Sequence, residues 1–464
     1  MEFENVYFLG IGGIGMSALA RYFLHEGKRV AGYDRTRTAL TDALAAEGAA
    51  VCYDEAAECI PAPFRDRRTT VVVYTPAVPD DHAGLAWFRR EGFEVVKRSQ
   101  MLGLLSAGKY VQAVAGTHGK TTTSTLLAWL DRGTTGGGSA FLGGLSKNFG
   151  SNLVLGSGDR LTVEADEFDR SFLRLDPDTA VITSADPDHL DIYGTHEAMK
   201  EAFAQFICQI RPGGYLVLKR GTDLRVDNPA ITVYGYACDA PADFHAANVR
   251  LLDGGRYRYD IVVPDGVYRD CTLGVPGWVN VENSVAAVAA LWCAARARGE
   301  RPDGERLRAA LASFEGVKRR FECYINTPRQ VYMDDYAHHP RELAATLASV
   351  REMFPGRRIT ALFQPHLYTR TRDLCDGFAE ALSLADEAVL LPIYPAREEP
   401  IPGVDSQMIA RRLTVPWCIV EREALAETVA AMNTDVVISF GAGNIDACCA
   451  AIAEKLKEKA GTTA

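Results

Sequence analysis

The residues best placed to do chemistry form one short run, Ala115-Gly-Thr-His-Gly-Lys-Thr-Thr-Thr123. A strand-like apolar segment (110–115) precedes this run, and a helix-like segment (124–130) follows it. In such a layout backbone N–H groups and the helix N-terminus face phosphate oxygens, the lysine reaches the β- and γ-phosphates, and a threonine hydroxyl can hold Mg²⁺. The pattern therefore predicts a site for ATP or GTP, with contacts from Gly116, Thr117, His118, Gly119, Lys120, Thr121 and Thr122.

One position departs from the usual triphosphate loop. Val114 lies six residues before Lys120, where glycine is standard, so the turn must be tighter. A Gly-Lys-Thr turn without any ligand would have the same residues. The flanking strand and helix favour the nucleotide site over that alternative.

A second glycine-rich loop, Gly10-Ile-Gly-Gly-Ile-Gly15, lies near the N-terminus between a predicted strand (6–10) and a predicted helix (17–25). Asp34 follows 19 positions after Gly15, at the end of the next predicted strand. This is the layout of a dinucleotide fingerprint, in which glycines admit a pyrophosphate and the acid meets a ribose hydroxyl. A nicotinamide cofactor, a nucleotide-sugar and a turn without a ligand all remain open on this pattern alone.

Acidic residues follow a later predicted strand in the run Val163-Glu-Ala-Asp-Glu-Phe-Asp169. Carboxylates at a strand end near a phosphate loop are how Mg²⁺ is usually held against ATP. Glu164 is the best candidate because it comes first after the strand. Asp166, Glu167 and Asp169 fit a solvated loop equally well.

Histidines follow three further strand ends. His189 lies among acids in Asp186-Pro-Asp-His-Leu-Asp191, where a metal ligand or phosphate contact and a structural histidine are both open. The runs Asp334-Asp-Tyr-Ala-His-His-Pro340 and Phe363-Gln-Pro-His-Leu-Tyr-Thr-Arg-Thr-Arg372 come later in the chain. Polar residues at neighbouring strand ends predict the mouth of an open α/β sheet.

The composition narrows the class of protein. The chain has 464 residues, a formal net charge of −10 and a pI near 5.5, which argues against general nucleic-acid binding. We find no apolar run of the ~20 residues that a membrane span needs and no secretory signal. The eleven cysteines include no Cys-x-x-Cys pair. We therefore expect a cytoplasmic protein whose cysteines are reduced.

Alternating strand and helix patterns predict three α/β domains in series. We expect a Rossmann-like N-terminal domain (1–107), a central P-loop-type ATP-binding domain (108–316) and a Rossmann-like C-terminal domain (317–464) that completes the ATP and amino-acid site. The run 133–139 is expected to be a flexible connection, and Gly254-Gly255 to be a hairpin turn.

Taken together, the motifs resemble the Mur ligase family, and they occur in family order over essentially the whole chain. Besides the two glycine loops they are Glu-Ala-Asp-Glu-Phe-Asp-Arg-Ser-Phe from Glu164, Asp-His-Leu-Asp from Asp188, Asp-Asp-Tyr-Ala-His-His-Pro from Asp334, Phe-Gln-Pro-His from Phe363 and Gly-Ala-Gly-Asn-Ile from Gly441. The first glycine loop and the run from Asp334 are most similar to those of the alanine-adding member.

This resemblance implies an ATP- and Mg²⁺-dependent amide synthesis in peptidoglycan formation. The carboxylate of UDP-N-acetylmuramate would attack the γ-phosphate of ATP, and the amine of L-alanine would attack the resulting acyl phosphate. A monomer or weak homodimer, with no nucleic-acid or membrane partner, is expected. The alternative within the family is a ligase that recycles a tripeptide onto the same nucleotide-sugar.

The resemblance also implies roles for single residues around ATP. Lys120 would hold the β- and γ-phosphates, and Thr121, Glu164 and His189 would ligate the metal ions. Further nucleotide contacts would come from Asn280, Asn283, Arg320 and Asp335. The residues expected to act in catalysis are Lys120, Glu164, His189, Arg320, Asp335 and His338.

The other substrates would bind elsewhere. His338, His366 and Arg370 would surround the acceptor carboxylate and the alanine, and Asp34 would lie near the uridine or its ribose. The pyrophosphate would lie against Gly10, Gly12, Gly13, Ile14, Gly15, Met16 and Ser17.

Two positions differ from the family pattern. Val279 replaces a common histidine beside Asn280, and Leu367 replaces an arginine after the histidine of Phe-Gln-Pro-His.

Two functions from other classes compete with the ligase. A nicotinamide-dependent oxidoreductase would leave the loop 116–123 without a purpose, and a non-catalytic nucleotide-binding regulator would need neither the metal candidates nor the C-terminal motifs.

Overall fold

The computed structural model describes residues 3–396 and 398–462, and it has the α/β class expected from the sequence, with three open sheets. Two compact units make up the chain. The first comprises Met1–Ala247, Ile261–Arg269 and Asn283–Phe314, and the second comprises Asn248–Asp260, Asp270–Glu282 and Glu315–Ala464.

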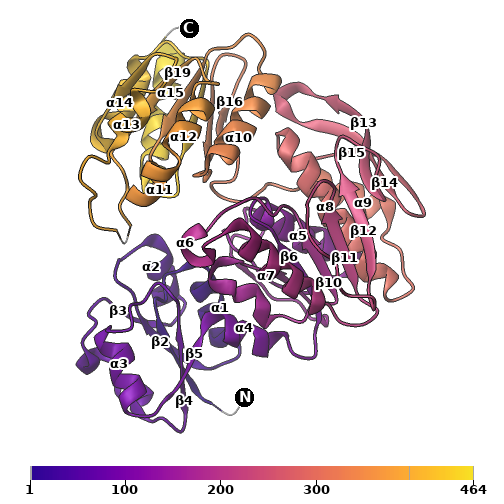
Figure 1. Ribbon diagram of the computed structural model, residues 1–464, viewed down its shortest axis with the longest axis vertical. Helices are drawn as coiled ribbons and strands as arrows, with labels where there is room; N and C mark the ends of the chain where they lie inside the picture. Colours follow the sequence, from indigo (N-terminus) through magenta and orange to yellow (C-terminus); the bar gives the residue numbers. More distant parts are fainter. Residues whose placement is uncertain (1–2, 397, 463–464) are drawn as a thin grey trace. The chain divides into compact units, whose positions relative to one another are not determined.

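The N-terminal sheet is parallel, with strand order β3-β2-β1-β4-β5 (Figure 1). Helices α1 and α4 pack on one face, and α3 packs on the other with two short 3₁₀ turns. The elements are β1 (Asn5–Leu9), α1 (Ile14–His25), β2 (Arg29–Tyr33), α2 (Ala39–Ala46), β3 (Ala50–Cys52), β4 (Thr70–Tyr74), α3 (Ala83–Arg90), β5 (Glu94–Lys97) and α4 (Arg98–Ser106).

The central sheet contains the parallel order β12-β11-β10-β6-β9-β7, and β8 pairs antiparallel with β7. Its first elements are β6 (Tyr110–Ala115), α5 (Lys120–Thr135), β7 (Ser139–Phe141), β8 (Leu153–Val154), β9 (Arg160–Glu164), η3 (Phe168–Arg174), β10 (Thr179–Ile182), α6 (Leu190–Tyr193) and α7 (His196–Cys208). Then follow β11 (Tyr215–Lys219), β12 (Thr232–Ala237), β13 (Phe244–Leu251), β14 (Tyr257–Val263), β15 (Gly266–Thr272), α8 (Trp278–Arg296) and α9 (Gly304–Ala312).

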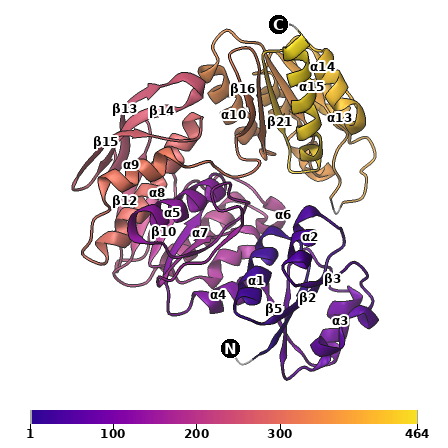
Figure 2. The same ribbon diagram turned by 180° about the vertical axis from the view of Figure 1, so that it is seen from behind.

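The C-terminal sheet has the order β16-β17-β21-β18-β19-β20, and only β16 runs antiparallel to its neighbour. Helices α10, α12 and α13 cover one face. Helices α14 and α15, labelled in Figure 2, cover the other. The elements are β16 (Glu322–Asn326), β17 (Val331–Asp335), α10 (Pro340–Met353), β18 (Ile359–Phe363), α11 (Tyr368–Asp373), α12 (Cys375–Leu382), β19 (Glu387–Leu390), α13 (Ser406–Ala410), β20 (Trp417–Ile419), α14 (Leu425–Ala431), β21 (Val436–Phe440) and α15 (Cys449–Thr462).

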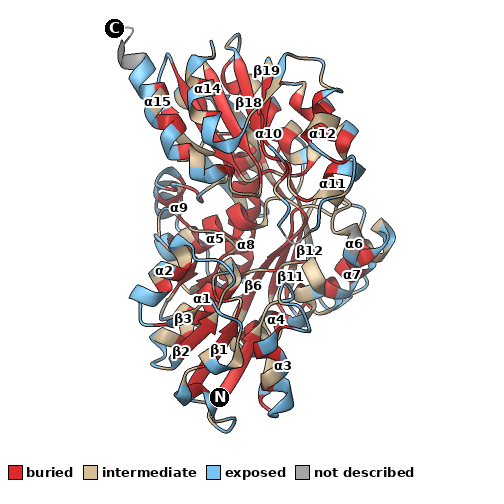
Figure 3. Ribbon diagram, turned by 90° about the vertical axis from the view of Figure 1, so that its left-hand side faces the viewer, coloured by how far each residue is buried: buried red, intermediate tan, exposed pale blue. Residues whose placement is uncertain are grey.

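The most deeply buried residues lie in the central strands of the sheets. Central strands such as β1, β6 and β18 are buried almost throughout, while the outer sides of the helices are exposed (Figure 3). Strands buried on both faces explain why these segments are near-continuous apolar runs and not alternating ones. The N-terminal and central sheets share one apolar cluster, in which α1 meets Phe141 and Leu153.

The expected flexible connection at 133–139 is wrong in its first part. Helix α5 continues through Gly133 to Thr135 and ends at Gly136, whose φ is 91°. The hydroxyls of Thr134 and Thr135 donate to the carbonyls of Leu130 (2.7 Å) and Asp131 (2.9 Å), which holds this last turn in helical form. Gly254, with a φ of 76°, forms the turn expected between β13 and β14.

No helix within the described residues is long and apolar enough to cross a membrane.

Candidate functional site

The glycine–lysine run forms a tight loop between β6 and α5. Gly116 has a φ of 128°, and a Cβ built there would lie 2.2 Å from Oγ1 of Thr183, so the position requires glycine. Thr183 and Ser184 follow β10 and fasten the loop from its side. Oγ of Ser184 accepts a hydrogen bond from the backbone N–H of His118 (2.8 Å) and lies 2.8 Å from Oγ1 of Thr117.

Lys120 is the first residue of α5, and its ammonium points back into the loop. Nζ donates to the carbonyl of Gly116 (2.7 Å) and to Oε1 of Glu167 (2.9 Å), and it lies 2.8 Å from Oε2 of Glu167. Burial alone would lower the pKa of Lys120, but the carboxylates of Glu167, Asp166 and Glu164 outweigh it and raise that pKa. The ammonium therefore stays charged.

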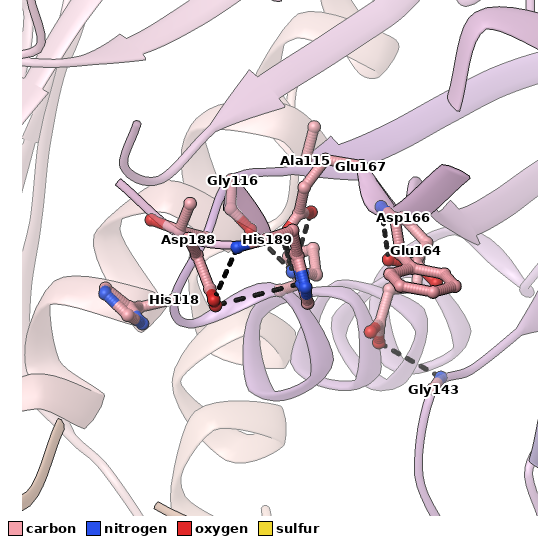
Figure 4. Close-up of polar contacts among 12 residues, drawn as sticks. Ala115, Gly116, His118, Gly143, Glu164, Asp166, Glu167, Asp188 and His189 are labelled. Atoms are coloured by element: carbon pink, nitrogen blue, oxygen red, sulfur yellow. Dashed lines mark hydrogen bonds and ion pairs between the residues drawn. The ribbon is translucent and has the colours of Figure 1, made fainter. Parts of the chain in front are cut away.

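The acidic run after β9 spreads its side chains over several partners (Figure 4). Glu164 accepts from Oγ1 of Thr121 (3.1 Å) through Oε1 and from the N–H of Gly143 (3.1 Å) through Oε2. This brings together a hydroxyl and a carboxylate, two oxygen groups that suit Mg²⁺. Asp166 and Asp169 instead pair with Arg98 (3.5 Å) and Lys97 (2.7 Å).

From the sequence, Glu167 fits a site residue and a solvated loop equally well, and the structure buries its side chain completely. Burial raises the pKa of the Glu167 carboxyl, and the Lys120 ammonium opposes that rise. Its backbone carbonyl accepts from the hydroxyl of Tyr193 (2.6 Å). The sequence gives no direct signal for this burial, because the partner that stabilises the charge is 47 positions away.

His189 lies beside the same acids. Its Nε2 is 3.7 Å from Oε1 of Glu167 and 3.8 Å from Oδ2 of Asp188, and its φ of 52° is unusual for a residue other than glycine. The ring packs edge-on against Phe168 at 5.3 Å. His118, on the phosphate loop, lies 3.4 Å from Asp186 in the same strand-end segment.

Within the described residues, no group of three or more His, Cys, Asp or Glu side chains converges as a metal cage. A cage is not what Mg²⁺ needs beside ATP, since it is commonly held by one or two carboxylates and by substrate phosphates. Thr121, Glu164 and His189 supply a hydroxyl, a carboxylate and an imidazole at one sheet edge. The contact between the Thr121 hydroxyl and the Glu164 carboxylate fits a metal ion shared with a nucleotide, whereas His189 contacts Glu167 and Asp188.

The first glycine loop connects β1 to α1 in the same unit. Asp34, expected near a ribose, accepts from the N–H of Gly12 (2.7 Å) and of Thr36 (3.1 Å), so its carboxylate braces this loop. A Cβ at Gly15 would lie 2.8 Å from the guanidinium of Arg98. Sequence reasoning missed Arg98, which places a positive charge beside the loop and has no motif of its own.

The loop 10–17 is also tied to the central sheet. Ser17 is fully buried and receives a hydrogen bond from Nδ2 of Asn152 (2.9 Å), which also donates to the carbonyl of Ile14 (2.5 Å). Arg21 donates to Oδ1 of Asn152 (2.6 Å). The sequence gives no signal for the role of Asn152, because this residue contacts a segment more than a hundred residues away.

The two candidate adenine residues fall in different units. Asn283 belongs to the unit of the phosphate loop, and its Oδ1 accepts from Oγ1 of Thr123 (3.3 Å). Asn280 belongs to the other unit, where its Nδ2 donates to the carbonyl of Pro276 (2.7 Å).

Asp335 ends β17 in the second unit and is buried. Its Oδ2 accepts from Oγ1 of Thr346 (2.7 Å), and its Oδ1 accepts from the N–H of Ala337 (3.3 Å). Burial raises the pKa of Asp335 to about 6, although the Thr346 hydrogen bond and the charge of Arg320 oppose the rise. The guanidinium of Arg320 lies over the ring of Tyr336 at 4.8 Å.

The remaining candidates lie around the ends of β17 and β18. His338 is 6.3 Å from His366 between ring centroids, and His366 stacks on Tyr394 at 5.8 Å. Arg370 is on α11, one helical turn beyond Leu367. Leu367 has a φ of 70°, a left-handed conformation at the position that departs from the family pattern.

Comparison with known sequences gives the same family over the whole chain. Residues 5–110 match the Mur ligase family catalytic domain, residues 114–291 the Mur ligase middle domain, and residues 319–443 the Mur ligase glutamate ligase domain. UDP-N-acetylmuramate–L-alanine ligase of Parabacteroides distasonis is 50% identical over 444 residues, 95% of both chains. The enzyme of the same name from Flavobacterium johnsoniae is 42% identical, over 98% of this chain and 99% of its own.

Solved structures agree with this likeness. The UDP-N-acetylmuramate–alanine ligase of Thermotoga maritima superposes with a TM-score of 0.80 at 27% identity, covering 98% of this chain and 99% of its own. A murein peptide ligase of Psychrobacter arcticus has a TM-score of 0.70 at 22% identity, covering 98% of both chains, and at that identity it shows the shared fold.

Gly116→Ala should destabilise the fold, because its Cβ would overlap Oγ1 of Thr183 at 2.2 Å and approach two backbone nitrogens. We expect a loss of about 2–5 kcal/mol in the free energy of unfolding, measured by urea denaturation. Gly108→Ala is the control, since Gly108 also has a positive φ but has open space around it, and it should cost about 1–2 kcal/mol. Equal losses in the two variants would contradict the close approach.

Asp335→Asn should change how stability depends on pH. The carboxyl ionises near its ordinary value of 3.8 in the unfolded chain but keeps its proton in the fold up to about pH 6. The fold therefore binds more protons between these values, and its free energy of unfolding should fall by about 3 kcal/mol as the pH rises through this window. Urea denaturation from pH 4 to 7 should show this fall in the native chain and not in the variant. Parallel curves would refute the raised pKa.

Proposed function

The chain belongs to the Mur ligase family, and on this premise we propose that it joins L-alanine to the carboxylate of UDP-N-acetylmuramate, with ATP as the energy source, in peptidoglycan synthesis. The observation that carries this function is the 50% identity to an alanine-adding relative over 95% of both chains. The phosphate loop and the acids gathered around Lys120 support an ATP-dependent reaction of this kind.

The reaction has two chemical steps. An oxygen of the muramate carboxylate attacks the γ-phosphorus of ATP, which forms an acyl phosphate and releases ADP. L-Alanine first loses its ammonium proton to solvent, and its free amine then attacks the acyl carbon. The tetrahedral intermediate expels phosphate, which takes up the second N–H proton, and the amide remains. Because an anion attacks a polyanion, the first step depends on cations and N–H donors that offset the repulsion.

The residues of the first unit are assigned to this first step. Lys120 supplies the fixed positive charge for the β- and γ-phosphates, and the backbone N–H groups of the loop face the phosphate oxygens. Thr121, Glu164 and His189 would hold Mg²⁺, which supplies further neutralisation of phosphate charge when it is bound. Asn283 contributes to the adenine contacts.

The pyrophosphate of the UDP-sugar is assigned to the first glycine loop, 10–17. Its backbone at the start of α1 offers N–H donors, and the guanidinium of Arg98 lies beside Gly15. Asp34 holds the loop through Gly12 in addition to any contact with the uridine. We assign these residues to binding and not to the chemical steps.

The second unit is assigned the remaining contacts. Arg320 and Asp335 would meet the nucleotide, Asn280 the adenine, and His338, His366 and Arg370 the acceptor carboxylate and the alanine. The three-domain division at 107 and 316, the cytoplasmic location and a monomeric or weakly dimeric state belong to the same proposal.

The proposed function predicts that ADP release needs all three substrates together. With Mg²⁺-ATP and UDP-N-acetylmuramate, steady ADP release should require L-alanine, and an L-alanyl tripeptide acceptor assayed in parallel should give little turnover. A coupled assay for ADP measures both rates. Turnover with the tripeptide alone would show that the chain is the tripeptide-recycling ligase. Binding of NADH, without any ADP release from ATP, would exclude a ligase.

Lys120→Ala should abolish turnover while UDP-N-acetylmuramate still binds through the first glycine loop. We expect a fall in kcat of about a thousandfold, because a charge aimed at the transferred phosphoryl group is lost. The variant also leaves Glu167 buried without its partner, which should cost about 3–5 kcal/mol of stability. Glu167→Gln in the same background should restore the stability but not the turnover. Unchanged turnover in Lys120→Ala would refute the role of this lysine.

A further inference from the structure

Glu167 has no place in the set of residues assigned above, although its side chain is fully buried at the centre of the site. It follows β9 and Glu164, and its own backbone is fixed by the hydroxyl of Tyr193 at 2.6 Å. A carboxylate is rarely buried completely unless it is paired, and this one is paired with Lys120. The lysine proposed to bind phosphate therefore faces an acid.

The geometry of Lys120 shows how the ammonium meets this acid. An ammonium has three donors. One donates to the carbonyl of Gly116 at 2.7 Å and one to Oε1 of Glu167 at 2.9 Å, and Oε2 of Glu167 lies at 2.8 Å. The charge of the lysine is thus directed at a protein carboxylate, so a γ-phosphate entering the loop must compete with Glu167 for it.

The surroundings of Glu167 add a second contact. The same Oε1 lies 3.7 Å from Nε2 of His189, so this carboxylate stands between the phosphate-loop cation and a candidate metal ligand. Like charges repel strongly where water is excluded. Glu167 therefore weakens the binding of a triphosphate in its ground state, while it keeps the ammonium charged and in place.

Resting on the proposed function, we propose that Glu167 is a positioning residue for phosphoryl transfer and acts through Lys120. It holds the ammonium in the empty loop and competes with the γ-phosphate of ATP. The lysine then gives more of its stabilisation to the transition state, as negative charge moves onto the leaving ADP, and less to bound ATP. Only interactions that are stronger in the transition state raise kcat.

The test is Glu167→Gln, which removes the negative charge and keeps the size of the side chain. Calorimetric titration with Mg²⁺-ADP and with the non-hydrolysable triphosphate AMPPNP measures the two affinities. We expect AMPPNP to bind about tenfold more tightly than to the native chain, ADP to bind within about threefold of its native affinity, and kcat for alanine-dependent ADP release to fall by about tenfold or more.

Asp169→Asn is the matched control. Asp169 lies two positions further along the same acidic run, pairs with Lys97 at 2.7 Å, and has a φ of 52°, a conformation that asparagine tolerates. Both affinities and kcat should stay at their native values in this variant. If Glu167→Gln does not fold, Glu167→Asp retains the charge but shortens the side chain, and it should shift the AMPPNP-to-ADP affinity ratio in the same direction by a smaller factor.

Nucleotide binding and turnover of the native chain distinguish a failure of the proposed function from a failure of the role proposed for Glu167. A native chain that binds neither nucleotide would refute the proposed function. A native chain that turns over, together with variants whose AMPPNP-to-ADP ratio is unchanged, would overturn the role of Glu167 alone. Equal weakening of both nucleotides with a lower melting temperature would also overturn it, because a purely structural role predicts that pattern.

Discussion

The ammonium of Lys120 lies between the carbonyl of Gly116 and the carboxylate of Glu167, and the shape of the candidate site follows from satisfying this buried ion pair. An isolated buried charge would cost several kcal/mol, so both partners must be held close together. On the loop, Gly116 adopts a φ of 128°, and its carbonyl accepts a hydrogen bond from the ammonium. On the acidic run, the carbonyl of Glu167 accepts hydrogen bonds from the hydroxyl of Tyr193 (2.6 Å) and from the N–H of Arg170 (2.9 Å), which fix its backbone.

The parallel sheet explains how residues distant in sequence reach this pair. The carboxyl ends of β6, β9 and β10 lie at one edge, so Lys120, Glu164 and Ser184 come together although they lie in three separate segments. The same unit holds the first glycine loop, which Asn152 and the apolar cluster around α1 tie to the central sheet. Two glycine loops on one continuous core suit the proposed enzyme, in which one loop is assigned to a nucleotide and the other to a nucleotide-sugar.

Much of this arrangement could be predicted from the sequence, because apolar runs bounded by glycine, proline or acids mark buried strands clearly. Strand β6 coincides with the expected segment 110–115, and β1 (Asn5–Leu9) is shifted by one residue from the expected segment 6–10. Helix α5 begins at Lys120, four residues before the expected start. Its first turn was not expected because Thr121 to Ser124 are polar, although the structure buries them as it buries apolar residues. The burial of Glu167 and the bracing of Gly12 by Asp34 could not be predicted, because each depends on a partner that only the fold brings near.

If the site activates a carboxylate by phosphoryl transfer, one oxygen of that carboxylate must end in the released phosphate. UDP-N-acetylmuramate labelled with ¹⁸O in its carboxylate should be turned over with Mg²⁺-ATP and L-alanine, and the released phosphate analysed by mass spectrometry. We expect one labelled oxygen in the phosphate for each amide bond formed, because the attacking oxygen leaves with the phosphoryl group. Phosphate without label would contradict the acyl phosphate and the role given to Lys120.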